Sequence, residues 1–321
     1  MSIGQALRLW ITLETIMLPH QHLTLLMRWE RGLALKQLIS AVIKPGMRVL
    51  DAGTGTGVAA LWAAQAGAEV VGVDRGDLEI ATQMAKANGL AERVRFLQAD
   101  LNELTPDLVG GRFDALIAMV YFNDARRDEA QSRLVHRLCE NLLHPGAIRI
   151  PDQVVYTATL CEWPTQDLET RKNRLLAQQQ TLEGYYDLQF WPLMNQMQHS
   201  PPPSWYPERG QDGMLQSADL RVLSPVWPAF NVNYEAPGKP YPTHWVVPVN
   251  ADGLANAVLW AQALKYKDTL IFRNESISWC NPALKVSRGE TISAALDAQW
   301  RAENTLRVST HQLPFSRSFA P

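Results

Sequence analysis

Cysteine is scarce in this sequence, with 3 residues among 321. The three cysteines stand at positions 139, 161 and 280, far apart and without a Cys-x-x-Cys pair. This spacing argues against a disulfide framework and against a thiolate zinc site, and it fits a reducing compartment. We therefore expect a cytoplasmic protein without a bound metal.

An excess of positive charge is also lacking, because 30 Lys and Arg face 32 Asp and Glu and the formal net charge is −2. A chain so balanced has no broad basic surface for nucleic acid. No apolar run reaches the roughly 18 residues of a membrane span. The apolar N-terminal stretch follows no basic segment and precedes no small-residue cleavage site, unlike a signal peptide. We expect neither nucleic acid nor a membrane as partner.

The chain changes character near Pro151, since most of its prolines and tryptophans lie at or beyond that residue. Before it, short Val, Ile and Leu runs alternate with helical patterns. Strands are expected at 48–50, 70–73, 94–97 and 115–117, and helices at 58–66, 80–87 and 134–142. Strands alternating with helices predict a Rossmann-like α/β domain whose parallel sheet is buried on both faces.

Beyond Pro151 the pattern shortens to strands separated by turn residues. They are expected at 154–156, 220–223, 245–249, 257–260 (ended early by Ala261) and 269–272. This spacing predicts a mostly-β, barrel-like domain. A polar stretch at 168–182 predicts a helical insertion, and three prolines at 201–203 a loop. The expected organisation is a helical segment (1–40), a Rossmann-like domain (41–150) and a barrel-like domain (151–321).

A glycine-rich turn joins the first expected strand to the first expected helix. Gly53, Gly55 and Gly57 let the backbone turn tightly and approach a ligand. The G-x-G-x-G spacing differs from the G-x-G-x-x-G of dinucleotide sites. Asp51, two residues before the first glycine, would repel a pyrophosphate but suit the ammonium group of S-adenosylmethionine. We therefore predict an S-adenosylmethionine-dependent methyltransferase, with Thr54 of the turn also at the cofactor.

Two further acids follow expected strands and complete the predicted cofactor site. Asp74 ends the second strand and is placed to accept hydrogen bonds from two ribose hydroxyls. Asp100 follows the third strand, near the expected position of adenine. For Asp100, a solvated carboxylate or a helix cap is the alternative. For the glycines, the alternative is a tight strand–helix turn without a ligand.

Residues from about His22 to Pro151 resemble the protein arginine methyltransferase family, which joins a Rossmann-like domain to a β-barrel. The stretch 142–151 is similar to the family's L-x-P-G-G-x-x-x-P junction, with Ala147 in place of the second glycine. Residues 22–26 resemble its H-x-x-M-L segment. The resemblance implies that Arg31 binds the cofactor carboxylate, with Arg28 as its rival if the register slips. Ordinary exposed arginines on an amphipathic helix are the alternative.

The resemblance weakens at the acceptor loop, where the family carries two glutamates that flank a guanidinium. Here Met119, expected beside the cofactor, stands at the first glutamate position and Asp128 at the second, with Glu129 adjacent. Met119 cannot pair with a guanidinium, whose unpaired charge costs several kcal/mol when buried, although Asp124 is close enough in sequence to replace it. Together with Tyr121, these acids are the loop residues expected nearest the methyl group.

We therefore expect a specific small molecule or peptide as acceptor. A true protein arginine methyltransferase and a non-catalytic cofactor-binding scaffold are the alternatives.

Two segments of the second half carry weaker resemblances. The stretch 243–245 matches the family's Thr-His-Trp motif, which makes His244 a candidate catalytic residue, while 276–279 is its rival by position along the barrel. A packed strand histidine is the alternative. The segment 168–191 falls where the family has its dimerisation arm, which implies a homodimer; a surface insertion is the alternative.

Overall fold

The computed structural model describes residues 19–121, 125–163, 165–194, 220–236, 238–296 and 305–310. The chain divides into two compact units. The first consists of Met1–Val155, Asn231–Pro240 and Ala263–Arg273, and the second of Tyr156–Phe230, Tyr241–Gln262 and Asn274–Pro321. Long strands beyond residue 152 therefore contribute residues to both units.

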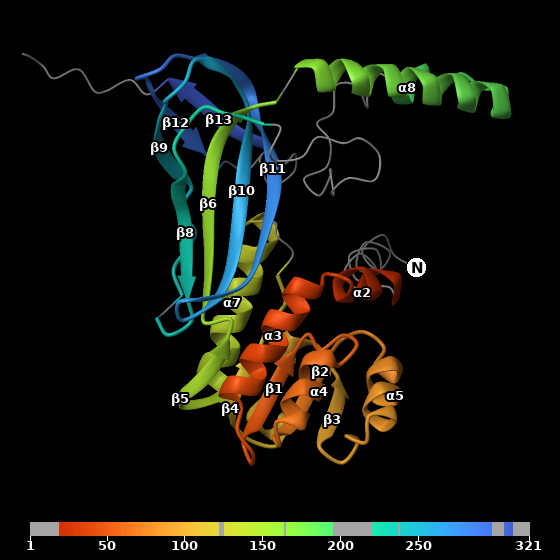
Figure 1. The fold of residues 1–321 in the computed structure, drawn as a ribbon, viewed down its shortest axis with the longest axis vertical. Helices are drawn as coiled ribbons and strands as arrows, with labels where there is room; N and C mark the ends of the chain where they lie inside the picture. The colour runs from red at the N-terminus through yellow and green to blue at the C-terminus, as the bar shows by residue number, and fades with distance from the viewer. Residues whose placement is uncertain are drawn as a thin grey trace, which may run out of the picture. The chain divides into compact units, whose positions relative to one another are not determined.

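In its described residues the first unit begins with two helices, α2 (Pro19–Leu26) and α3 (Trp29–Val42), and then alternates strands with helices (Figure 1). These elements are β1 (Arg48–Ala52), α4 (Val58–Gln65), β2 (Glu69–Asp74), α5 (Glu79–Ala87), β3 (Val94–Gln98), η1 (Leu101–Glu103), α6 (Pro106–Val109), β4 (Phe113–Ile117), α7 (Ala125–Leu142) and β5 (Leu143–Ile150). The sheet order is β3-β2-β1-β4-β5, with neighbouring strands parallel. The predicted Rossmann-like domain is confirmed.

The central strand and its helix show why this sequence packs so closely. All residues of β1 after Arg48 are buried, as expected for a strand covered on both faces. Helix α4 buries three alanines and one leucine (Ala60, Leu61, Ala63 and Ala64) and packs on β1 and β2. Small side chains let a helix lie close to a sheet.

The strand order reverses between β1 and β4. The chain runs from β1 outward through β2 to β3 and then returns to the other side of β1 as β4. In open parallel sheets, ligands bind outside the carboxyl ends of the strands at such a reversal. The turn after β1 and the loop after β4 both begin there, so the topology places the glycine-rich turn where a ligand is expected.

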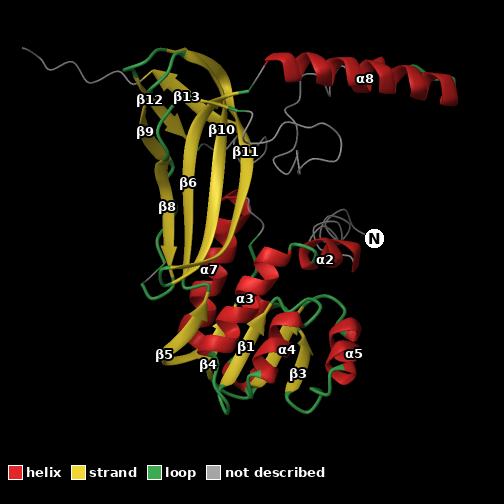
Figure 2. Ribbon diagram, viewed as in Figure 1, coloured by secondary structure: helices red, strands yellow, loops and turns green. Residues whose placement is uncertain are grey.

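Residues beyond Pro151 form a sheet of eight strands with one long helical insertion among the described residues (Figure 2). The elements are β6 (Gln153–Glu162), α8 (Thr165–Tyr186), β7 (Arg221–Val222), β8 (Trp227–Asn233), β9 (His244–Pro248), β10 (Gly253–Tyr266), β11 (Thr269–Val286), β12 (Thr291–Ala295) and β13 (Thr305–Thr310). The order is β7-β6-β10-β11-β13-β12-β9, and β8 pairs with β6. The predicted mostly-β domain with a helical insertion is confirmed.

Several predicted boundaries need correction. The strand expected to end at Trp260, before Ala261, continues to Tyr266, because Trp260, Gln262 and Leu264 keep alternate positions buried between β6 and β11. Strands β5, β8, β12 and β13 were not predicted. Strand β8 contains Pro228, which is exposed on a strand that lies off the main path of the sheet, where proline is tolerated. The proline run at 201–203 lies outside the described residues.

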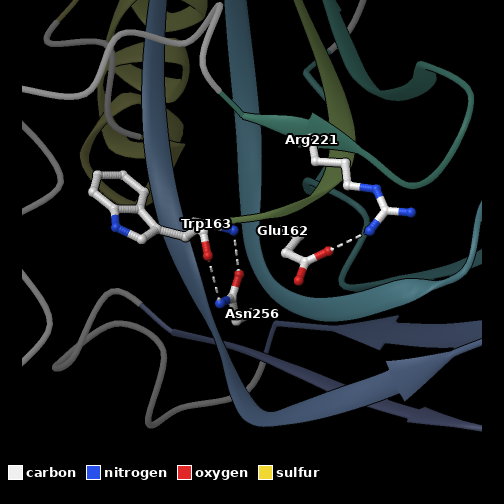
Figure 3. A network of polar contacts seen from close by, with 4 residues as sticks. All are labelled: Glu162, Trp163, Arg221 and Asn256. Carbon is white, nitrogen blue, oxygen red and sulfur yellow. Dashed lines mark hydrogen bonds and ion pairs between the residues drawn. The ribbon is translucent and has the colours of Figure 1, made fainter. Parts of the chain in front are cut away.

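Side-chain hydrogen bonds anchor the point where the chain leaves β6 for α8 (Figure 3). The backbone N–H of Trp163 donates to Asn256 Oδ1 at 2.6 Å, and Asn256 Nδ2 donates back to the backbone carbonyl of Trp163 at 3.3 Å. Glu162 forms an ion pair with Arg221 at 3.1 Å. The backbone groups that the ladder no longer pairs are thereby satisfied at the root of the insertion.

Two further observations concern the described part of the chain alone. No helix in it has both the length and the apolar character to cross a bilayer. No group of three or more His, Cys, Asp or Glu side chains in it is arranged to hold a metal ion.

Candidate ligand-binding site

The turn after β1 adopts backbone conformations that favour glycine. Gly53 and Gly55 have φ values of 75° and 52°, a region that other residues rarely adopt. Space is also limiting, since a Cβ on Gly53 would lie 2.7 Å from Val120 Cγ1 and one on Gly55 2.8 Å from His22 Cε1. The loop after β4 and helix α2 therefore both lie against the turn.

The Asp51 carboxylate, only 3% exposed, holds this turn against the helix that follows it. Its Oδ2 accepts hydrogen bonds from Thr54 Oγ1 at 2.6 Å and from the Ala60 N–H at 3.1 Å. Ala60 lies in the first turn of α4, where Gly57 has no side chain to cap the helix. Asp51 thus supplies the missing cap from β1.

Burial also changes the acidity of this carboxyl group. It raises the pKa of Asp51 to about 6, against the opposing effect of the hydrogen bonds from Thr54 and Ala60; the nearby charge of Asp74 raises it further. Within the described residues, both hydrogen bonds of the carboxylate fall on Oδ2. The role predicted from the sequence, binding an ammonium group, therefore falls to Oδ1 and stays a prediction.

Asp74, at the end of β2, connects the glycine turn to the next loop. Its Oδ2 accepts a hydrogen bond from the Gly55 N–H at 2.9 Å, and its Oδ1 accepts one from the Gly76 N–H at 2.9 Å. Each carboxylate oxygen can accept a second hydrogen bond. Asp74 is thereby fixed in orientation and still able to accept the two ribose hydroxyls predicted for it.

Asp100 has a local structural role. Its Oδ1 accepts hydrogen bonds from the backbone N–H and from Nδ2 of Asn102, both at 2.8 Å, and Asp100 is the N-cap of η1. This is the helix-cap alternative that the sequence left open. An additional contact with adenine stays a prediction.

Arg31, in the first turn of α3, is half-buried and has no hydrogen bond or ion pair to any residue that the structure describes. Its Cζ lies 5.8 Å from the ring centroid of Phe272, and Arg28 Cζ lies 6.0 Å from the same centroid. Burial lowers the pKa of Arg31, and the charge of Arg28 lowers it further. An uncompensated cation of this kind is suited to an anionic group of a ligand.

The loop after β4 brings two of the predicted residues near the glycine turn. Met119 and Tyr121 are half-buried and flank Val120, whose side chain is the one that limits the space at Gly53. The Tyr121 hydroxyl is buried and has no hydrogen-bond partner in the described structure. Such a group is costly unless something else satisfies it. Asp124 lies outside the described residues.

The remaining acids of the predicted acceptor loop lie in α7. Asp128 is fully buried. Glu129 forms an ion pair with Arg133, four residues further along the helix, at 2.8 Å. Their predicted roles at the acceptor stay predictions.

The two candidate segments of the second unit have different surroundings. His244 is exposed and pairs across the strands with Ala295 of β12. Trp279, in the rival segment, packs edge-on against Trp163, with ring centroids 4.9 Å apart, beside a buried apolar cluster. Their roles at an acceptor site stay predictions.

The structure thus brings together most of the residues predicted to bind the cofactor: Asp51, Gly53, Thr54, Gly55, Gly57 and Asp74. Sequence reasoning missed their neighbours, because these come from other elements. Val120, which limits the space at Gly53, follows β4, and Phe96 of β3 lies where a Cβ on Gly57 would approach to 2.9 Å. Phe272 of β11 was also missed; it is a neighbour of Arg31. Only His22 had a signal, its place in the H-x-x-M-L segment.

Comparison with known proteins adds a domain family. Residues 43–190 match a family described as a methyltransferase domain. The chain is 39% identical over 89 residues to the ribosomal protein L11 methyltransferase of Thermus thermophilus, covering 28% of this chain and 34% of that protein. It is 32% identical over 118 residues to the ribosomal protein arginine N-methyltransferase rmt3 of Schizosaccharomyces pombe, covering 36% and 21%. The chain thus spans about a third or less of the length of these relatives.

Similarity of fold extends over nearly the whole chain. The Trypanosoma brucei PRMT1 enzyme–prozyme heterotetrameric complex with AdoHcy matches with a TM-score of 0.65 at 16% identity, over 91% of this chain and 93% of that one. Protein arginine methyltransferase 10 of Arabidopsis thaliana matches with a TM-score of 0.60 at 15% identity, over 87% of each chain. The two-part fold implied by the sequence resemblance is confirmed.

Proposed function

We propose that this chain, which carries a methyltransferase domain on the fold of the protein arginine methyltransferases, transfers a methyl group from S-adenosylmethionine to an acceptor. The observation that carries the proposal is the turn between β1 and α4. The glycines of this turn have positive φ, and two carboxylates hold it: Asp51 of β1 caps α4, and Asp74 at the end of β2 accepts from Gly55. The turn lies at the reversal of strand order.

The residues present fit this cofactor. Asp74 has capacity for the ribose hydroxyls, Asp51 Oδ1 for the ammonium group and Arg31 for the carboxylate. The buried Tyr121 hydroxyl needs a partner, which a polar group of a bound ligand would supply. The bound cofactor supplies an electrophilic methyl group on a sulfonium. These residues bind and orient it, while Val120 and Met119 exclude water from one side.

The acceptor we propose is a specific small molecule or peptide. Met119 stands where the resembled family has a carboxylate, and Glu129 is already paired with Arg133. Removing one partner of a buried charge costs about 3–5 kcal/mol. An arginine side chain would therefore be poorly compensated, whereas Met119 and Tyr121 offer an apolar, adaptable surface to a neutral group.

Arginine N-methylation is the second candidate. It is favoured by the overall fold and by the buried carboxylate of Asp128, which lies in the element after the acceptor loop. The third candidate is a scaffold that binds the cofactor at the same site but transfers no methyl group.

The experiment that separates these candidates uses S-adenosylmethionine labelled on its methyl group. The protein is incubated with Arg-Gly-rich peptides in one series and with fractionated small molecules and peptides in another. Label in the second series alone supports our proposal, and robust label on arginine supports the second candidate. Calorimetric binding of S-adenosylhomocysteine without transfer to any fraction supports the scaffold. Absence of binding contradicts all three.

We also propose that two chains pair through the segment 168–191 and that the protein works in the reducing cytoplasm, where Cys139, Cys161 and Cys280 stay free. The end of this segment exposes large side chains: Tyr185 is 80%, Tyr186 63% and Trp191 58% exposed. Exposed apolar groups of this size mark association surfaces. Light scattering at tens of micromolar should give a dimer, and a protein lacking the segment a monomer; a monomeric intact protein contradicts the pairing.

A further inference from the structure

We propose that Phe272 is a positioning residue for Arg31, holding the face of its guanidinium so that the N–H edge stays available to the carboxylate of the ligand. The inference rests on the proposed function, in which Arg31 binds that carboxylate. It adds a residue more than 240 positions away in the sequence, on strand β11. The part of β11 that carries Phe272 belongs to the same compact unit as Arg31.

The geometry supports an interaction through the ring face. The Cζ atoms of Arg31 and Arg28 lie 5.8 and 6.0 Å from the Phe272 centroid, within the roughly 6 Å reach of a cation–π contact. A phenylalanine ring has no hydrogen-bond acceptor comparable to a carboxylate. It therefore attracts the cation without occupying the guanidinium N–H groups, whereas a carboxylate in the same place would occupy them.

The second arginine explains why a positioning residue is needed. Two guanidinium groups at one ring repel each other, and Arg31 is half-buried without an anionic partner among the described residues. Without the ring, the Arg31 side chain would move toward solvent and separate from Arg28. With it, the positive charge stays in place and a ligand carboxylate gains most from binding there. The arrangement should therefore favour ligands that carry a carboxylate over those that lack one.

The test compares two ligands that differ at this end. S-adenosylhomocysteine has the amino-acid carboxylate, and 5′-methylthioadenosine has the same nucleoside without the amino-acid part. Calorimetry is run on the wild type and on Phe272→Leu, which keeps apolar bulk but removes the aromatic ring. We expect Phe272→Leu to weaken S-adenosylhomocysteine about three- to tenfold, the range of a partly desolvated cation–π contact, and to leave 5′-methylthioadenosine unchanged. Phe272→Trp, which keeps an aromatic ring at this position, should bind S-adenosylhomocysteine as the wild type does.

Leu270→Ala is the matched control. Leu270 is exposed, two residues before Phe272 on the same strand and hence on the same face. It should leave both ligands unaffected. An equal loss of both ligands in Phe272→Leu, or no loss of either, overturns the inference, as does Arg31→Gln with unchanged binding of S-adenosylhomocysteine. A wild type that binds neither ligand instead overturns the proposed function.

Discussion

The two sides of the strand reversal are built differently. On the side of β1, polar groups are fixed by backbone: Asp74 accepts from Gly55 and Gly76, and Asp51 from Ala60. On the side of β4, the loop offers Met119 and a buried Tyr121 hydroxyl without a partner in the described structure. The first side thus has the polar groups of the proposed cofactor site already fixed by the backbone. The second side leaves a hydroxyl to be satisfied, which makes it the side that a bound molecule would complete.

The largest expected effect tests the side of β1. Asp74→Ala removes a carboxylate that we expect to accept two ribose hydroxyls, each hydrogen bond worth about 1.5–3 kcal/mol when charge-assisted. Binding of S-adenosylhomocysteine should weaken by at least about a hundredfold. Calorimetry measures this, with Glu92→Ala as an exposed acidic control. Affinity within threefold of the wild type would mean that Asp74 serves the turn alone.

Gly53→Ala should separate backbone conformation from close approach. Gly53 has φ of 75°, and an added Cβ would meet Val120 at 2.7 Å; Gly146 has φ of 77° with open space around its Cβ position. Both changes incur the left-handed cost of about 1–2 kcal/mol. Only Gly53→Ala should lose more stability than this backbone cost, because its Cβ also meets Val120, and only Gly53→Ala should lose cofactor affinity. Urea unfolding and calorimetry on both variants decide this. Equal losses of unfolding free energy would show that the Val120 side chain moves aside to accommodate the new methyl group.

Asp51→Asn tests the cost of keeping a charge in the cap. The folded pKa of about 6 lies above the unfolded value of about 3.9. A raised folded pKa contributes stability that is fully present below pH 4 and is lost as pH rises through 6. The difference is on the order of 3 kcal/mol. Asparagine still accepts from Thr54 and Ala60, so the variant should lack this pH dependence.

Urea unfolding between pH 4 and 7 measures that dependence in both proteins. Relative to Asp51→Asn, the wild type should lose stability across this window. Parallel curves for the two proteins would contradict the assignment. Weaker cofactor binding by the variant would support a role of the charge at Oδ1.

Local motifs explain why much of the cofactor side was predictable. Asp51 to Gly57 are contiguous, and strand ends locate Asp74, so spacing alone places these residues together. Val120 and Phe272 come from distant elements, and no local pattern marks the approach of Val120 to Gly53 or of Phe272 to Arg31. His22, which lies at Gly55, was marked only by its place in the H-x-x-M-L segment. The capping role of Asp51 was missed because Gly57, where the cap would normally be sought, has no side chain. The end of β10 was misplaced because pairing on both sides overrides the weak strand preference of Ala261.

The smallest expected effect concerns the side of β4, where Met119 lies. Met119→Glu restores a carboxylate at the position where the resembled family pairs a guanidinium, and Met119→Gln is its uncharged control of the same shape. If the acceptor is a neutral group, Met119→Glu should reduce transfer to it, because the new charge must be desolvated in the loop. Transfer to Arg-Gly-rich peptides should rise from a low level by about tenfold, the effect of one charge-assisted pair. Labelled-cofactor assays measure both. Strong methyl transfer to arginine by the wild type, little changed by Met119→Glu, would contradict this prediction. It would mean that Asp124 supplies the carboxylate that pairs with the guanidinium, and that the protein is an arginine methyltransferase in its acceptor as well as in its fold.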